Sequence, residues 1–207
     1  MNGTRPTGIR LPPRRGSVVT REKLLDAAGR LLVTEGTGFS LPELARAAGV
    51  SSAATYRQFT STQDVFQEFY DRKIGELVTE LQSAVEGPGS AQDGFVRIGM
   101  RWTEMATEWG TAVARIRSAE GFLERERRGE PRTSALHKIL APVIEALVAE
   151  GDIPHQNVDY AVLLWINAFD ERGVVDLTST LGWTSRRVAR ALSGSVLAAL
   201  RASADVS

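Results

Sequence analysis

The chain has 207 residues, of which 43% are hydrophobic and 24% are charged, and its formal net charge is zero. This length and composition are typical of a soluble globular protein with one or two domains. The absence of cysteine excludes disulfides, thiolate nucleophiles and cysteine-based zinc sites. The only two histidines are His137 and His155, so we expect neither a histidine-rich metal site nor a histidine catalytic dyad.

The N-terminal residues and the apolar runs bear on where the protein works. No apolar run approaches the ~20 residues that a membrane span needs. The first residues, MNGTRPTGIRLPPRRG, lack the apolar centre of a secretory signal. We therefore expect a cytoplasmic protein with no membrane partner.

Positive charge is concentrated at the N-terminal end. Up to Thr60 the chain has nine Lys and Arg against four Asp and Glu, a net charge of +5, and the remainder carries −5. A basic N-terminal segment followed by an acidic remainder favours contact between that segment and a polyanion. Because four of the nine positive charges precede Gly16, a basic tail with no partner is the alternative.

The N-terminal part divides into an arm and a small helical domain. Residues 1–16 are rich in Pro, Gly and Arg and are predicted to be a disordered basic arm. Apolar residues at helical spacing predict a helix from Ser17 to about Gly36. A second helix follows, with Ser40 and Glu43 as a capping box. Gly49 ends it, and Ser51 caps a short third helix. We assign 17–62 to this domain and 63–207 to a second one.

The remainder also reads as helical. Ser61 and Asp64 form a capping box for a long amphipathic helix, and the EGPGS stretch at 86–90 ends it. Further helices are predicted at about 91–109, 111–122, 133–150, 158–181 and 185–202. ERERRGEPR is expected to be a polar loop, Pro142 to kink its helix, and Gly182 to separate the last two. With no β-alternating run of useful length, the predicted fold class is all-α with about nine helices.

Two short helices joined by a tight turn, the second of them polar, predict a helix-turn-helix. Ala45 is small enough for the two helices to cross closely, and Gly49 suits a left-handed turn. Val50 and Phe59 are expected to anchor both ends of the second helix in the core. The alternative is a generic helical hairpin whose second helix is merely polar and exposed.

The second helix of this motif supplies the candidate DNA contacts. Small side chains there allow close approach to base edges and thymine methyls, and the candidates for this are Ser51, Ser52, Ala53 and Thr55. Side chains with hydrogen-bond donors further along contact phosphates, which position the helix without reading sequence; these are Tyr56, Arg57 and Gln58.

The run REKLLDAAGRLLVTEGTGFSLPELARAAGVSSAATYRQFTSTQDVFQEFYDRKI resembles the N-terminal domain of the TetR family of transcriptional regulators. The matching features span residues 20 to about 75: a first helix ending in EG, then SLPELARAAGVS, then YRQF, then a capped long helix. The resemblance implies a three-helix DNA-binding domain followed by a helical domain for ligand binding and dimerisation. It also implies a homodimeric, ligand-responsive repressor that binds a double-stranded DNA operator.

The resemblance also implies roles for single residues. Ser40 matches the hydroxyl that caps the second helix and touches phosphate, residues 51–55 match the base-facing segment, and Tyr56 matches a phosphate-contacting tyrosine. Gln58 stands where a histidine is common. Thr62 replaces a lysine that contacts the DNA backbone. Ser52-Ala53-Ala54 replaces the frequent Lys-Gly-Thr, and Thr55 replaces an aliphatic residue. With fewer positive charges here, the electrostatic share of affinity is expected to be low, and arginines of the arm could compensate in the minor groove.

An aromatic stripe lies in the second domain, residues 63–207, which we call the body. Phe95, Ile98, Trp102, Met105 and Trp109 share one helix face, which fits either plain core packing or the wall of an apolar pocket. The resemblance favours a pocket, with further candidates at Phe69, Phe122, Leu136 and Leu140. Because the stripe offers few polar groups, we expect an unidentified apolar or aromatic small-molecule effector.

The last two helices are candidates for a dimer interface. Two helices with small residues from each of two chains can form a four-helix core. The candidate contacts are Trp165, Phe169, Val188, Leu192, Val196 and Leu200. The alternative is a helical hairpin within one chain.

Two other classes of function compete with a DNA-binding regulator. Catalysis is not expected, because no Ser/His/Asp order, phosphate loop or metal-ligand spacing appears, and we predict no catalytic residue, metal or cofactor. The other is a helical protein-interaction module that has lost specific DNA binding, which the low charge of the recognition helix keeps open.

Overall fold

The computed structural model describes residues 15–116 and 120–203. Within these ranges it contains ten α-helices, one π-helical turn and no strand, so the predicted all-α class is confirmed. The predicted arm lies almost wholly outside the described residues. None of the helices in the described ranges is long and apolar enough to cross a membrane.

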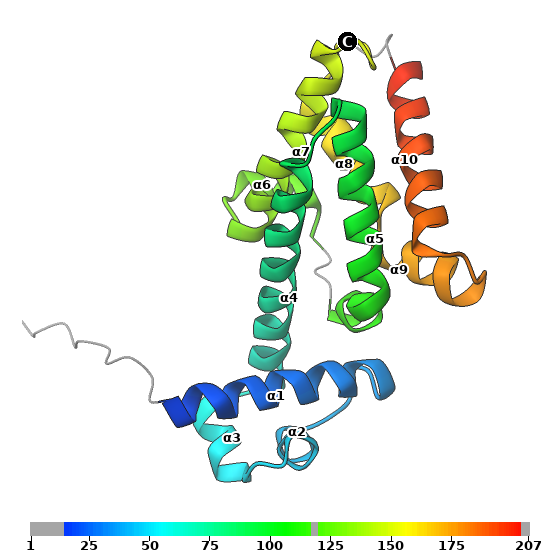
Figure 1. Ribbon diagram of the computed structural model, residues 1–207. Helices are drawn as coiled ribbons and strands as arrows, with labels where there is room; N and C mark the ends of the chain where they lie inside the picture. The colour runs from blue at the N-terminus through cyan, green and yellow to red at the C-terminus, as the bar shows by residue number, and fades with distance from the viewer. Residues whose placement is uncertain (1–14, 117–119, 204–207) are drawn as a thin grey trace, which may run out of the picture.

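The first three helices form a small domain at one end of the molecule (Figure 1). They are α1 (Arg15–Thr34), α2 (Leu41–Ala48) and α3 (Ser52–Gln58). In Figure 1, α1 lies across the end of the body, with α2 and α3 beneath it. Their shared core contains Leu24, Ala28, Leu44 and Phe59, all at most 2% exposed, so the burial of these side chains fixes how the three helices cross.

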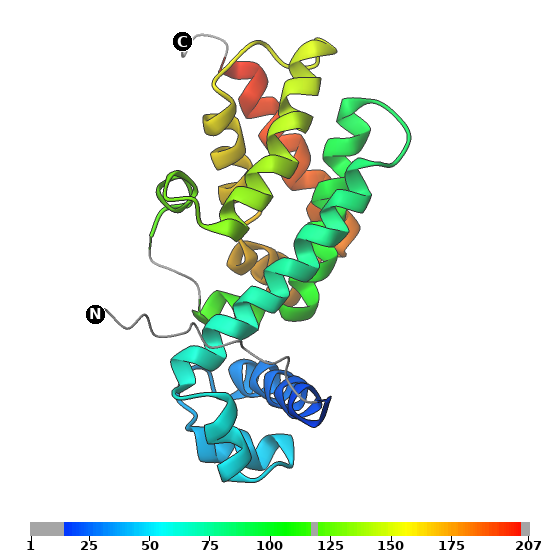
Figure 2. The same ribbon diagram turned by 90° about the vertical axis from the view of Figure 1, so that its left-hand side faces the viewer.

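The body begins with α4 (Thr62–Val85), which leaves the N-terminal domain and runs up beside α5 (Ala91–Ile116) (Figures 1 and 2). Then come α6 (Phe122–Arg127), α7 (Pro131–Ala149) and α8 (Val158–Ala168). The chain ends with α9 (Glu171–Val175), a π-helical turn (Asp176–Thr180) and α10 (Ser185–Ala202). Helices α4, α7, α9 and α10 all pack on α5, so α5 is the central helix of the body.

Close packing around α5 depends on a glycine. A Cβ atom added at Gly99 would lie 2.7 Å from Ser193 Oγ on α10 and 2.8 Å from Phe169 Cζ. Both distances are shorter than real side-chain contacts, so only glycine at this position lets α10 and Phe169 approach α5 so closely.

Several predicted boundaries are wrong. The expected break near Trp109 does not occur, because Gly110 packs inside α5 against Val175 and α5 continues to Ile116. Part of the expected ERERRGEPR loop is helical, as α6. By contrast, Pro142 lies inside α7, as the predicted helix at about 133–150 requires. The expected helix at 158–181 ends at Ala168, where the Asp170 carboxylate accepts a 2.9 Å hydrogen bond from the Arg172 backbone N–H and caps α9.

Candidate nucleic-acid interface

The turn between α2 and α3 has the geometry that the sequence predicts. Ser40 and Glu43 form the capping box of α2, and Gly49 ends the helix at φ 66° in the left-handed region. The hydrogen bond from the Ser40 side chain is the main reason that the pKa of Glu43 lies below its ordinary value. Ser40 is exposed at the start of α2, and its hydroxyl donates a 2.7 Å hydrogen bond to the Glu43 carboxylate.

Helix α3 presents one exposed face. Ser51 caps the helix by accepting a 3.2 Å hydrogen bond from the Ala54 backbone N–H. Ser52, Ala53, Tyr56 and Arg57 are exposed, and the Tyr56 side chain is 54% exposed. These positions follow the helical period and therefore share one face, so α3 offers two small residues, one phenol and one guanidinium to solvent.

Thr55 does not belong to that face, which corrects the sequence prediction. Its side chain is completely buried, and its hydroxyl donates a 3.3 Å hydrogen bond to the backbone oxygen of Ser51. The reason is helical geometry: Thr55 faces inward from α3, between the outward-facing Ser52 and Tyr56. A base edge cannot reach this hydroxyl without opening the domain.

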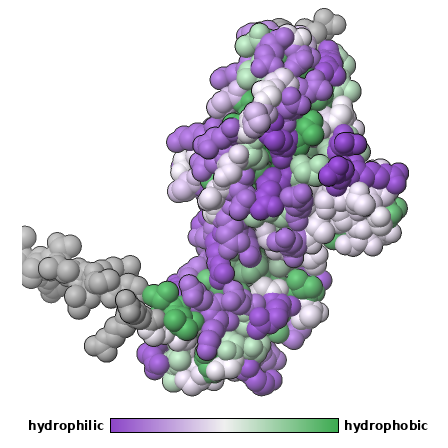
Figure 3. Space-filling view, viewed as in Figure 1, coloured by the Kyte–Doolittle hydropathy of each residue, from purple (hydrophilic) through white to green (hydrophobic). Residues whose placement is uncertain are grey.

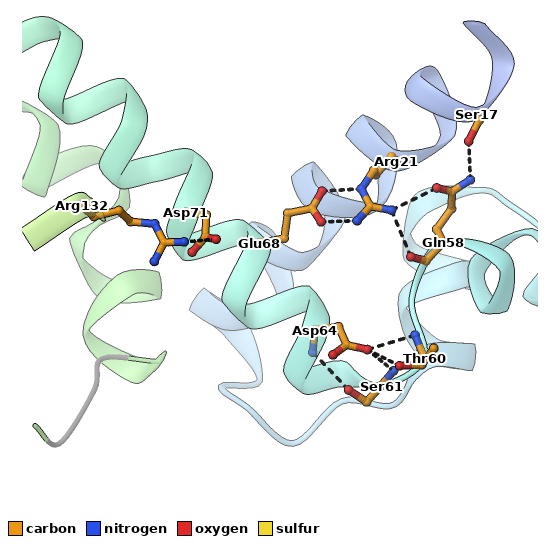
Figure 4. Close-up of polar contacts among 9 residues, drawn as sticks. All are labelled: Ser17, Arg21, Gln58, Thr60, Ser61, Asp64, Glu68, Asp71 and Arg132. Carbon is orange, nitrogen blue, oxygen red and sulfur yellow. Dashed lines mark hydrogen bonds and ion pairs between the residues drawn. The ribbon is translucent and has the colours of Figure 1, made fainter. Parts of the chain in front are cut away.

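Gln58 is held inside the domain and is not a free phosphate ligand. Its Nε2 donates to Ser17 Oγ at 2.8 Å, and its Oε1 accepts from Arg21 at 3.2 Å (Figure 4). Arg21 also donates to the Gln58 backbone oxygen at 3.0 Å. The side chain therefore joins the end of α3 to α1, a function that its sequence position did not reveal.

Arg21 connects this end of α3 to α4. Its guanidinium makes a two-pronged ion pair with Glu68 (Figure 4). The same guanidinium lies 4.6 Å from the centre of the Phe59 ring. Arg21 lies on α1 and contacts both α3 and α4. It therefore makes the main polar contacts that join the three helices. Sequence reasoning missed it because its partners lie 37 and 47 residues away.

The start of α4 is capped by its own carboxylate. Asp64 accepts hydrogen bonds from the backbone N–H groups of Thr60 and Ser61 at 3.1 and 2.9 Å and from the Thr60 hydroxyl (Figure 4). These hydrogen bonds, above all that from the Thr60 side chain, hold the pKa of Asp64 below its ordinary value. Thr62, a predicted DNA contact, is half-buried in the first turn of α4.

The comparison with known families matches this domain. The model of the bacterial regulatory proteins of the tetR family matches residues 24–69, from α1 into α4. The N-terminal domain is therefore that of a TetR-family transcriptional regulator. The chain is also 40% identical over 72 residues to the HTH-type transcriptional regulator AcrR of Shigella flexneri. That match covers 33% of this chain and spans only about a third, 34%, of the relative.

Solved structures extend the likeness in fold to the body of the chain. The fatty acid degradation regulator FadR of Bacillus halodurans superposes with a TM-score of 0.71 at 14% identity, over 86% of this chain and 94% of that one. FadR of Bacillus subtilis, solved in complex with stearoyl-CoA, gives the same TM-score and identity over 85% and 97%. At such low identity the likeness establishes the fold alone.

The aromatic stripe of the body packs in the core, which is one of the two alternatives that the sequence left open. All nine candidate ligand residues are at most 7% exposed. The Trp102 indole N–H donates a 2.7 Å hydrogen bond to the Phe169 backbone oxygen. Trp102, Phe122 and Leu136 border a cavity of only about 20 Å³, roughly the space of one water molecule. The cavity beside these three residues is therefore too small for an effector.

Larger spaces lie nearer the N-terminal domain. A groove of about 500 Å³ between α1, α4 and α5 is lined in part by two of the candidate ligand residues, Phe69 and Trp109. A second cavity, of about 370 Å³, lies between the start of α4, the end of α5, α6 and the start of α7. The residues that line this cavity are more polar than the predicted ligand-binding residues, and they include Tyr70, Arg125 and Arg132.

The residues assigned to the dimer interface are buried within one chain, so that assignment needs correction. Trp165, Phe169, Val188, Val196 and Leu200 are at most 2% exposed, and only Leu192 is half-buried. The Trp165 ring lies 5.1 Å from Trp102 and 4.3 Å from Phe169. The apolar face of α10 therefore packs within its own chain, because a helix buries its larger apolar side chains against the core of that chain.

Proposed function

We propose that the chain is a homodimeric repressor that binds a palindromic DNA operator through α3 and releases it when a small molecule binds the body. The single observation that carries this proposal is the exposed face of α3, made of Ser52, Ala53, Tyr56 and Arg57. Small residues at the start of a recognition helix suit close contact with base edges. The phenol and the guanidinium suit phosphates beside the groove.

The effector part of the proposal has its own support. The FadR structure of Bacillus subtilis was solved with stearoyl-CoA, which shows that a body of this fold can take a small molecule. The cavity of about 370 Å³ is at the low end of the ~300–1,000 Å³ that ligand pockets occupy. We therefore propose a smaller effector for this chain than a long-chain acyl-CoA.

A dimer interface is proposed on the outward faces of α8 and α10. Small residues line the solvent side of α10, at Ala191, Gly194, Ser195 and Ala198. On the neighbouring α8, Tyr160 is 44% exposed and Leu164 is half-buried. Small residues let helices of two chains approach closely, and a two-fold dimer places two recognition helices ~34–36 Å apart, one turn of DNA.

In vitro selection of DNA from a random pool, at two salt concentrations, tests the proposal. We expect a palindromic site at both salts, and Tyr56→Phe should weaken binding to all sequences about equally because it removes a phosphate contact. Glu126→Gln, on α6 and away from α3, is the control. Enrichment of no motif, together with binding that Tyr56→Phe leaves unchanged, would instead favour the protein-interaction module.

A further inference from the structure

The cavity between α4, α6 and α7 has walls rich in hydrogen-bond donors. Among the described residues, its lining carries the guanidinium groups of Arg125 and Arg132 and the carboxylate of Glu130, which together have a net charge of +1. The side-chain amides of Gln63 and Gln67 add further donors. Phe66, Tyr70 and Ile116 supply apolar surface beside them. A wall of this kind matches a molecule with an anionic end and a short apolar part.

Of these two arginines, Arg125 is incompletely paired by the described part of the chain. The Arg125 side chain is 12% exposed, and its buried Nε has no hydrogen-bond partner among the described residues. Its bond to Glu130 is 3.3 Å long, and so is the bond from Arg132 to Glu130. Charge-assisted bonds are usually about 2.7–2.9 Å, so Glu130 holds both guanidinium groups loosely. A buried N–H without an acceptor is costly, which favours an added acceptor near Arg125.

Arg132 also connects this cavity to α4. It forms an ion pair with Asp71 (Figure 4), and its guanidinium lies 5.7 Å from the centre of the Tyr70 ring. Asp71 is one turn after Glu68, the partner of Arg21. Burial, the largest influence, raises the pKa of Asp71 despite the nearby Arg132. Helix α4 is therefore tied to the body and to the DNA-binding domain by ion pairs within one turn.

We propose that this cavity binds a small monocarboxylate, with its carboxylate on Arg125 and Arg132 and its apolar part against Phe66, Tyr70 and Ile116. Arginine binds carboxylates through two parallel hydrogen bonds, so the ligand competes with Glu130 and Asp71 for the two guanidinium groups. Loss of the Arg132–Asp71 ion pair frees α4 from α7 and changes the orientation of α1 and α3. This site deepens the proposed effector response and rests on it.

Calorimetric titration of the full chain with benzoate, phenylacetate, hexanoate and octanoate tests the site. We expect at least one acid to bind, and its uncharged amide to bind about tenfold or more weakly, because the amide loses the charge-assisted bonds. Arg125→Gln and Arg132→Gln should each weaken acid binding about tenfold or more. Arg127→Gln, in the same helix but exposed and outside the lining, should bind as the wild type does.

Three results would overturn the site: no acid binds at about 10 mM, an acid and its amide bind alike, or both arginine variants bind normally. If Arg125→Gln fails to fold, Arg125→Lys replaces it. Lysine keeps the charge but cannot make the two parallel bonds, so weaker acid binding supports the site and wild-type binding overturns it.

Operator affinity separates this proposal from the one on which it rests. With the bound acid at saturation, the affinity for the selected DNA site should fall. An unchanged affinity would overturn the effector response while leaving the DNA-binding proposal intact. If selection yields no DNA site at all, the repressor proposal fails, and the carboxylate site is judged by calorimetry alone.

Discussion

Glu68 on α4 receives a two-pronged ion pair from Arg21 on α1, and the same guanidinium holds Gln58 at the end of α3. The two side chains are 39% and 32% exposed, so solvent screens them in part. Their geometry nevertheless joins three helices at one point. Any movement of α4 relative to the body therefore reaches α3 through this contact.

The first prediction concerns that ion pair. In a double-mutant cycle, Arg21→Ala and Glu68→Ala should show a coupling energy of about 1 kcal/mol in urea unfolding, because the pair is two-pronged but partly exposed. Arg72 and Asp26 join the same two helices through a single 3.0 Å bond and serve as the control pair, with an expected coupling below about 0.5 kcal/mol. Equal coupling in the two cycles would contradict the importance assigned to Arg21.

The second prediction separates Thr55 from the outward face of α3. Thr55→Val removes a buried hydroxyl bonded to Ser51, so we expect a loss of about 1 kcal/mol of stability but the same selected DNA sequence. Ser52→Ala, on the exposed face, should change the preferred bases with little loss of stability. In vitro selection with each variant measures the preferred sequence, and urea unfolding measures the stability. A new preferred sequence for Thr55→Val alone would show that α3 reads DNA from another face.

These positions also show what the sequence could and could not predict. Capping boxes at Ser40 and Ser61 and the turn at Gly49 were predictable, because each depends on residues within a few positions of one another. The inward direction of Thr55 was not, because it depends on how α3 is rotated against α1 and α2. Trp102 and Trp165 were assigned to different sites, yet their rings are in contact. Periodicity marks an apolar face but does not say what covers it.

The third prediction follows from the pKa of Asp64, which three hydrogen bonds hold below its ordinary value of 3.8. A carboxyl group with a lowered folded-state pKa stabilises the fold above its unfolded-state pKa, and this stabilisation is lost as the pH falls through the folded-state value. Asp64→Asn should therefore lower stability near neutral pH, and its difference from the wild type should shrink below about pH 3.8.

Urea unfolding between about pH 7 and about pH 3 measures this difference. Glu124→Gln removes an exposed carboxylate of α6 and controls for the change in net charge. A deficit in Asp64→Asn that stays the same throughout the range would mean that Asp64 acts through packing and not through its charge.

The last prediction concerns the two faces of α10. Val196 is 2% exposed and lies against the core of its own chain, whereas Ala198, two residues later, is exposed. Ala198→Glu places a charge on the outward face and should convert a dimer to a folded monomer in sedimentation velocity, with little change in melting temperature. Val196→Glu buries an unpaired carboxylate at a cost of several kcal/mol, and the chain should lose its cooperative thermal transition.

If Ala198→Glu still sediments as a dimer, the chains associate through some other surface. A stably folded, monomeric Val196→Glu variant would instead return the interface to the face that packs against α5.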